Sequence, residues 1–98
     1  MINIEWEYNS FMQEHELHLM IYACDRVIAE LKEKDNGEYV CNYFLHKAYC
    51  DCLSFNAETL DKAKVHVEAV IVEDLKEIMH DVMDIILCIK AGNENESN

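Results

Sequence analysis

Carboxylates are the side chains that this sequence offers most often for chemistry. Asp and Glu account for 20 of the 98 residues, against 8 Lys and Arg. Several stand three or four residues apart, which on a helix would place their oxygens on adjacent turns. Oxygen ligands in that arrangement suit a hard, octahedral cation such as Mg²⁺. The carboxylates spaced in this way are Glu30 and Glu33, Glu58 and Asp61, and Glu77, Asp81 and Asp84.

These pairs carry a family resemblance. Glu30-x-x-Glu33, followed by Glu58-x-x-Asp61 or by Glu77-x-x-x-Asp81-x-x-Asp84, is similar to the paired acidic motifs of the all-α nucleotide pyrophosphohydrolases of the MazG type. The resemblance implies that carboxylates from two helices bind Mg²⁺ and that a water attacks the nucleotide phosphates. It covers a minority of the chain, and the sequence shows no basic cluster for a triphosphate. A Mg²⁺-dependent pyrophosphohydrolase is therefore an alternative hypothesis.

Histidine and cysteine offer other chemistry. His46, Cys50 and Cys52 could bind a transition metal, completed by one of His15, His18, His66 or His80. A regular helix would place His46 and Cys50 on one face and Cys52 away from it. His46 and Cys50 are also the local pair for a nucleophile and base, and Glu77-x-x-His80 matches half of a di-iron signature whose second copy is absent. We therefore expect no metal, no cofactor and no catalytic residue.

An acidic face is the strongest candidate for binding. On a helical wheel, four carboxylates fall within about 80° of one another, opposite an apolar stripe. Such a face is either simply solvated or imitates phosphates for a basic partner. Exposed aromatic residues near the N-terminus are a second feature typical of protein interfaces. The predicted partner-binding residues are Glu73, Glu77, Asp81, Asp84, Trp6 and Tyr8.

Charge and cysteine content narrow the class of protein. The formal net charge of −12 disfavours direct binding to nucleic acid or anionic lipid, because both need clustered Lys and Arg. The five cysteines are an odd number, and the N-terminus lacks the pattern of a signal peptide. No apolar run reaches the roughly 20 residues that span a bilayer. We expect a reduced, cytoplasmic protein without a membrane segment.

The spacing of apolar residues predicts an all-α fold. Leu17, Ile21, Cys24, Ile28 and Leu31 alternate steps of four and three residues, which is typical of one helix face over about 10–34. A second helix is expected over about 38–53, although its aromatic residues also favour strands. The alternation of apolar residues from Ile2 to Tyr8 predicts a short strand or an extended arm. The prediction is a bundle of three to four helices over residues 1–92 and a disordered tail over 93–98.

The third helix, about 57–91, has the clearest pattern. Its apolar residues follow heptad spacing, although the β-branched stretch between Val65 and Val72 could be a strand or a break. A continuous helix would be roughly 50 Å long, which is longer than its predicted partner helix. Either the helix breaks or a second chain covers it, which predicts a homodimer. The heptad positions are Val65, Val72, Leu75, Met79, Val82, Ile86 and Ile89.

These features together predict a non-catalytic, acidic interaction protein. It would be an inhibitor or adaptor that binds a basic surface of a nucleic-acid-handling protein. In composition only, the chain resembles the phosphate-mimicking inhibitors of phages and mobile elements, including anti-restriction and anti-CRISPR proteins. The alternatives are the Mg²⁺-dependent pyrophosphohydrolase and a structural assembly subunit.

Overall fold

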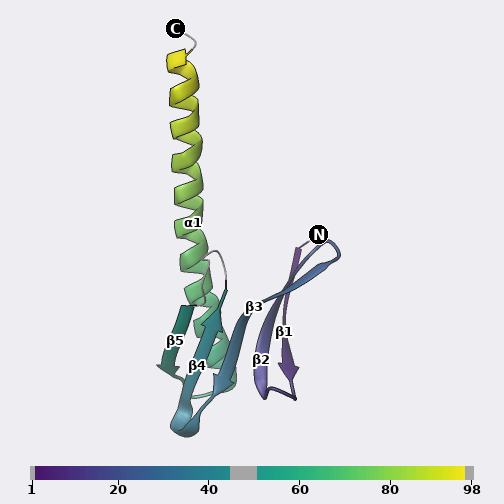
Figure 1. Cartoon of the computed structure of the whole chain (residues 1–98). Coiled ribbons are helices and arrows are strands. Elements are labelled where there is room, and N and C mark those ends of the chain that lie inside the picture. The colour runs from purple at the N-terminus through teal and green to yellow at the C-terminus, as the bar shows by residue number, and fades with distance from the viewer. Residues whose placement is uncertain (1, 45–50, 97–98) are drawn as a thin grey trace. The chain divides into compact units, whose positions relative to one another are not determined.

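The chain forms an antiparallel sheet followed by one long helix (Figure 1). The structure is a computed structural model that describes residues 2–44 and 51–96. The strand order is β1-β2-β3-β4-β5, so each strand pairs with its neighbour in the chain. The elements are β1 (Ile2–Asn9), β2 (Glu14–Ile21), β3 (Cys24–Glu33), η1 (Asp35–Gly37), β4 (Glu38–Tyr43), β5 (Asp51–Asn56) and α1 (Leu60–Glu96).

Two compact units divide the chain, Met1–Val67 and Glu68–Asn98. The first contains the sheet and the first two turns of α1, and the second contains the rest of that helix. Each unit is described by itself below.

The all-α prediction is wrong, and so is the helical bundle. The segment expected as the first helix forms strands β2 and β3, and the segment expected as the second helix contains β4 and the start of β5. The predicted alternation at the N-terminus is confirmed as strand β1, and the predicted long C-terminal helix is confirmed as α1.

A turn and a bulge explain why the strands imitate a helix. Ile21 pairs directly with Cys24 across a two-residue turn. Farther along, Leu17 pairs with Ala29 but His18 pairs with Val27, so Ile28 is the extra residue of a β-bulge. Each step of four residues covers two strand periods, so both residues lie on the same face. Each step of three residues, from Ile21 to Cys24 and from Ile28 to Leu31, includes the turn or the bulge. The turn and the bulge therefore keep these apolar side chains on one face of the sheet.

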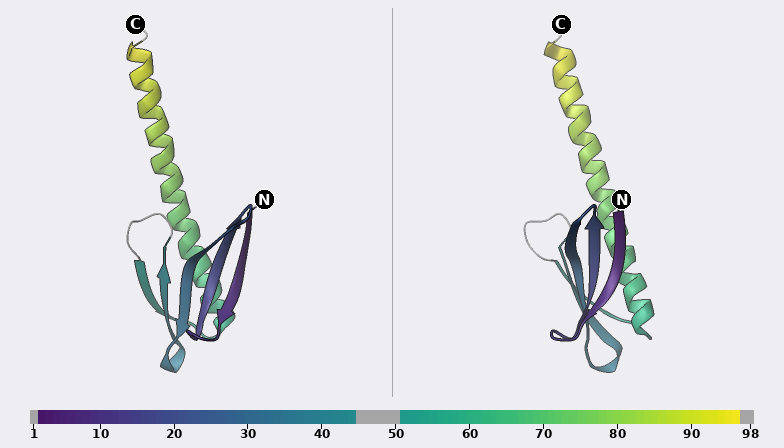
Figure 2. Two further views of the ribbon diagram at one scale, coloured as in Figure 1. Left: turned by 45° about the vertical axis from the view of Figure 1, so that its right-hand side comes forward. Right: turned by 90° about the vertical axis from the view of Figure 1, so that its right-hand side faces the viewer.

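The core of the first unit lies between one face of the sheet and the first two turns of α1 (Figure 2). Leu17, Leu31 and Cys41 are buried on the sheet, and Ala63 and Val67 are buried on the helix. Aromatic contacts continue this core toward β5, where the rings of Phe55 and His66 are 4.3 Å apart and those of Tyr39 and Phe55 are 5.9 Å apart.

Helix α1 begins at a cap and continues without a break. The Thr59 hydroxyl accepts a hydrogen bond from the Lys62 backbone N–H at 3.2 Å, as an N-cap residue does. The stretch from Val65 to Val72, for which a strand or a break was considered, is helical. The helix also passes through Gly92, where it was expected to end. No helix in the part of the chain that the structure describes is long and apolar enough to cross a membrane.

The β3–β4 turn depends on Asn36 and Gly37. Their φ angles are +59° and +75°, in the left-handed region that Gly and Asn adopt most readily. The Lys34 backbone N–H donates to the Glu38 carbonyl at 2.7 Å, which closes the turn. An Asn-Gly pair between apolar strands is a strong hairpin signal, whereas the sequence analysis expected a helix on either side of it, over about 10–34 and about 38–53.

The two glycines of the chain should respond oppositely to alanine. Gly37→Ala places a Cβ at positive φ and 3.2 Å from the Ala57 carbonyl oxygen, so we expect a loss of about 1–2 kcal/mol in the free energy of unfolding. Gly92→Ala adds a Cβ in open space on a helix, where alanine is favoured by about 0.5–1 kcal/mol. Urea unfolding followed by circular dichroism measures both. Equal stability of the two variants would contradict this assignment of the turn.

Candidate protein interaction surfaces

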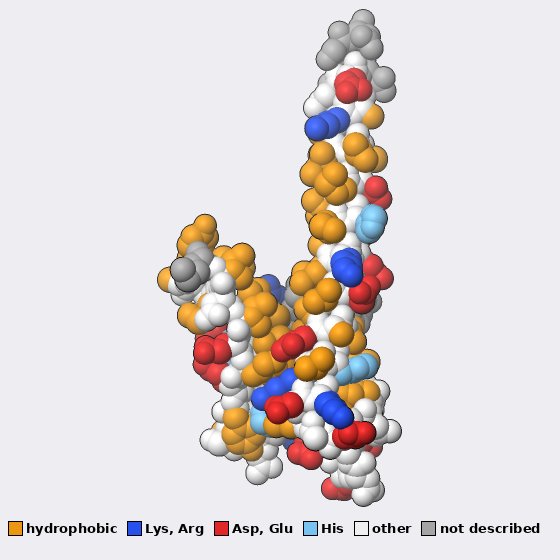
Figure 3. Space-filling model, turned by 180° about the vertical axis from the view of Figure 1, so that it is seen from behind, with side chains coloured by type: hydrophobic (Ala, Val, Ile, Leu, Met, Phe, Trp, Pro, Cys, Tyr) orange, Lys and Arg blue, Asp and Glu red, His pale blue; other side chains and the backbone are white. Residues whose placement is uncertain are grey.

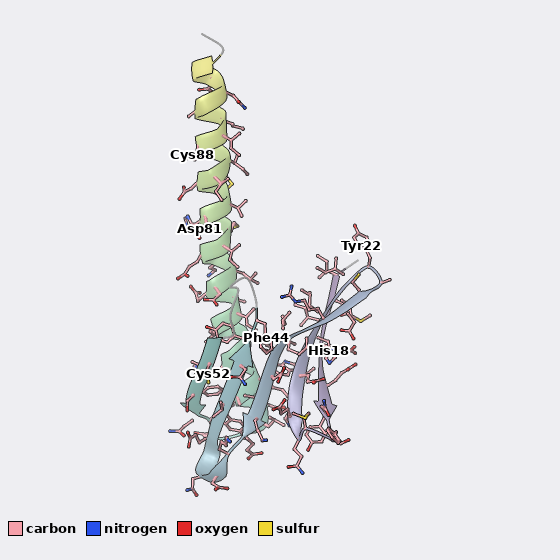
Figure 4. All side chains as sticks on the ribbon, in the orientation of Figure 1. His18, Tyr22, Phe44, Cys52, Asp81 and Cys88 are labelled. Carbon is pink, nitrogen blue, oxygen red and sulfur yellow. The ribbon has the colours of Figure 1, made fainter. Side chains whose placement is uncertain are left out.

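The predicted acidic residues lie on one face of α1 in the second unit. Glu73, Glu77, Asp81 and Asp84 are all exposed and follow one another over three turns. Asp81 is labelled on this helix in Figure 4. The Lys76 ammonium is 3.2 Å from a Glu73 carboxylate oxygen, and both side chains are largely exposed. Lys76 offsets one of the four negative charges, so the face remains acidic.

The other side of this helical unit is apolar. The predicted heptad residues from Val72 to Ile89 are 40–61% exposed, and Met83 and Ile85 beside them are more than half exposed. Figure 3 shows apolar side chains along much of α1. Large exposed apolar patches mark sites of interaction with proteins or membranes, so this stripe is a candidate interaction surface.

Trp6 and Tyr8 belong to the first unit, on the face of the sheet that carries the core. The Lys64 ammonium, from the first turns of α1, lies 5.6 Å from the centroid of the Trp6 ring, so this tryptophan takes part in the packing of helix on sheet. Tyr8 is more than half exposed, and its ring centroid is 4.8 Å from that of His15 across the β1–β2 pair. The predicted binding residues therefore divide between the two units.

The carboxylates of the pyrophosphohydrolase motif are not arranged on two helices. Glu30 and Glu33 lie on strand β3, and their odd spacing places them on opposite faces of the sheet. Glu58 precedes α1, where it pairs with Lys62. The helix pair that the resemblance implies is therefore not formed.

The other chemical candidates are also dispersed. His46 and Cys50 lie outside the described residues, and Cys52 is exposed on β5 (Figure 4). Within residues 2–44 and 51–96, no three His, Cys, Asp or Glu side chains are placed to hold a metal ion. The same part of the chain contains no detected pocket.

A second acidic surface, which the sequence analysis missed, covers the face of the sheet opposite the core. It surrounds His18, whose side chain is 12% exposed. The His18 ring nitrogens are 2.9 Å from an Asp25 oxygen, 3.0 Å from a Glu16 oxygen and 3.2 Å from a Glu7 oxygen. By register, β1, β2 and β3 place Glu5, Glu7, Glu14, Glu16, Asp25 and Glu30 on this face, and β4 adds Glu38.

The electrostatics of this acidic sheet face are coupled. The hydrogen bond that the His18 ring donates to Asp25 raises the pKa of His18, burial opposes it, and a second hydrogen bond to Glu16 adds to the increase, so the folded protein favours the imidazolium. Asn9 and His18 lower the pKa of Glu16 by bonding its carboxylate. Burial, together with a hydrogen bond and charge repulsion from Glu14, raises the pKa of Glu30. The imidazolium that these hydrogen bonds favour lies among the carboxylates of this face.

The sequence does contain a signal for this face. Glu14-His15-Glu16-Leu17-His18-Leu19 alternates strictly between the two faces of a strand, and so do the acidic and apolar residues of β1. A strand interpretation based on this two-residue period places Glu7, Glu16 and His18 on the same face of the sheet.

An exposed apolar area also lies at the β2–β3 hairpin. Tyr22, at the tip of this hairpin in Figure 4, has φ +57° and is 84% exposed. Next to it, Ile21 pairs with Ile2, and both are exposed on the core face of the sheet. A non-glycine residue at positive φ is strained, since its Cβ crowds the backbone.

His18 should make the stability of the sheet depend on pH. Because the pKa of His18 in the folded protein is raised above its ordinary value of 6.5, the stabilisation is fully present below that value. It is lost as the pH rises through the folded pKa. His18→Gln removes the titrating group. We therefore expect the variant to be less stable than the wild type at pH 6, and we expect this difference in stability to shrink as the pH rises toward 9, about three pH units higher.

Urea unfolding of the wild type and of the variant across this pH range measures the free energy of unfolding of each. Burial and Lys64 lower the pKa of His15, which gives an opposite pH dependence. His15 is present in both proteins, so its contribution cancels when the two free energies are subtracted. Asp25→Asn should in turn lower the pKa of His18 in an NMR titration. Stability curves that remain parallel at every pH would contradict the coupling.

The chain matches no protein-family model, no curated protein and no solved structure.

Proposed function

We propose that this chain acts by binding a basic surface of another macromolecule, as an inhibitor or adaptor, and not by catalysis. The observation that carries the proposal is the acidic face of α1, where Glu73, Glu77, Asp81 and Asp84 are exposed together. Within the described residues, Lys76 is the basic side chain that forms an ion pair on this face, and it engages Glu73. Three carboxylates remain available to a partner.

The spacing of the carboxylates along α1 supports a partner that ordinarily binds phosphates. Glu77 and Asp81 are one turn apart, which is a rise of about 6 Å along the helix. A row of negative charges on a rigid rod presents to arginine and lysine what a phosphate backbone presents. The partner class that fits is therefore the basic surface of a nucleic-acid-handling protein. The net charge of −12 supports this class, because it would accelerate the encounter with such a surface.

The acidic sheet face is a weaker candidate for the same role. Three of its carboxylates lie around His18, and the pKa of Glu30 is raised, which reduces its charge at mildly acid pH. A partner's arginine would have to compete with His18 for those oxygens. We therefore assign the binding of the basic partner to α1.

A structural assembly subunit is the second candidate. It is favoured by the exposed apolar stripe of α1, which the acidic face does not explain. This role and the binding of a basic partner use different sides of the same helix and are compatible.

Charge reversal on the acidic face should weaken capture of the partner. We expect Glu77→Lys with Asp81→Lys to weaken binding by about 100-fold, because like charges that face each other across an interface cost several kcal/mol. Folding should change little, since both side chains are exposed. Tagged protein expressed in its native cells would identify the partner, and calorimetry with the purified partner would measure the dissociation constant at increasing salt.

A matched control reverses two exposed carboxylates elsewhere, Asp35→Lys with Glu94→Lys, and has the same net charge. It should bind more than ten times as tightly as the first variant, a difference of about 1.4 kcal/mol or more. Equal binding by the two variants, or a dissociation constant that does not rise with salt, would overturn the proposal. Loss of a Mg²⁺-dependent release of pyrophosphate from a nucleotide in the first variant would favour the hydrolase instead.

A further inference from the structure

The apolar side of α1 in the second unit has the pattern of a helix seam. From Val72 to Ile89 the side chains repeat at alternating steps of three and four residues, which corresponds to the a and d positions of three heptads. The a positions are Val72, Met79 and Ile86, and the d positions are Leu75, Val82 and Ile89. All six are exposed, from 40% at Ile86 to 61% at Met79. The seam is therefore complete and uncovered in the single chain.

The flanks of the seam identify the kind of partner. One flank carries Ile78 and Ile85, and the other carries Lys76, Met83 and Lys90. Neither flank has an acidic residue between Val72 and Ile89, so nothing beside the seam selects a basic helix. The acidic residues of this segment instead lie on the outer positions. A helix with the same length and with apolar residues at its own a and d positions is the complementary occupant.

We propose that a second copy of this chain packs along this seam, so that the two α1 helices bury the six a and d residues against each other. A second copy meets the requirement because it has the same uncharged repeat, so that in an isologous pairing each apolar layer has an apolar counterpart.

The exposed area has the scale that a dimer needs. At roughly 50–100 Å² for each half-exposed aliphatic side chain, the seam together with Met83 and Ile85 amounts to about 400–800 Å². A standard stable interface buries about 800 Å² on each partner. The lysine stems on the flank add further apolar area.

This inference is independent of the proposed function. The acidic face lies opposite the seam, so pairing through the seam leaves Glu77 and Asp81 accessible and presents two acidic faces in one assembly. Salt separates the two interactions, because the dissociation constant of a basic partner rises with salt, whereas association through an apolar seam does not weaken.

Sedimentation equilibrium of the full chain tests the inference. We expect a mass of at least twice the 11.5 kDa of one chain at micromolar concentration, retained at high salt. Val82→Glu places a carboxylate in the seam and should raise the dissociation constant at least tenfold. The matched control Leu87→Glu makes the same kind of change at an exposed residue outside the seam, 58% exposed against 47% for Val82, and should leave the dissociation constant within about twofold.

Circular dichroism checks that both variants keep their helix content. If Val82→Glu loses it, Leu75→Gln is the replacement, because it introduces polarity into the seam without a charge. A wild-type protein that sediments as a monomer throughout this concentration range would overturn the inference. Equal weakening by the seam variant and the control would overturn it as well.

Discussion

The sheet has one apolar face, and the first unit depends on covering it. The first two turns of α1 provide the cover, and their Ala63 and Val67 side chains are buried. On the sheet, Leu17, Leu31 and Cys41 are almost completely buried. Burial of one such aliphatic side chain stabilises a fold by about 1.5–3 kcal/mol. An uncovered sheet of this size would expose these residues to water.

The same constraint explains the turn and the bulge between β2 and β3. A strand that continued with strict alternation would turn either Ile28 or Ala29 toward the polar side, yet both are buried. The extra residue of the bulge allows two consecutive apolar side chains to serve the core. On the polar side, the carboxylates of three strands come close together, and His18 lies among them where mutual repulsion would otherwise be greatest.

The two acidic surfaces differ in how their charge is balanced. On the sheet, hydrogen bonds tie Glu16 to Asn9 and His18, so its charge serves the fold. On α1, Glu77, Asp81 and Asp84 are exposed, and Lys76 forms its ion pair with Glu73 and not with any of these three. The sheet surface therefore contributes to stability, and the binding of a partner that we propose uses the helix surface. The uncharged seam on the other side of α1 is a separate surface with a separate driving force.

Much of the C-terminal half followed from sequence. Heptad spacing without a proline predicted a helix over most of this length, and α1 also includes the stretch from Val65 to Val72, where a strand or a break was an alternative. The assignment of Glu73, Glu77, Asp81 and Asp84 to one face rests on the same periodicity. The sequence also indicated a short strand or an extended arm at the N-terminus, because Ile2, Ile4, Trp6 and Tyr8 alternate with polar residues, and this segment is strand β1.

Only the tertiary structure decided the region from Ser10 to Glu33. The steps of four and three residues between Leu17 and Leu31 fit one helix face, and they fit equally well two strands joined by a turn and containing a bulge. The local spacing is the same for the helix and for the strands, so long-range pairing decides between them. As strands, β2 and β3 form hydrogen bonds with β1 and β4 and bury their apolar side against α1. The surroundings of His18 were hidden for the same reason, because Glu7 and Asp25 reach it only across paired strands. Sequence by itself determined the charge and the long helix, whereas pairing between distant strands determined which face each residue of the sheet occupies.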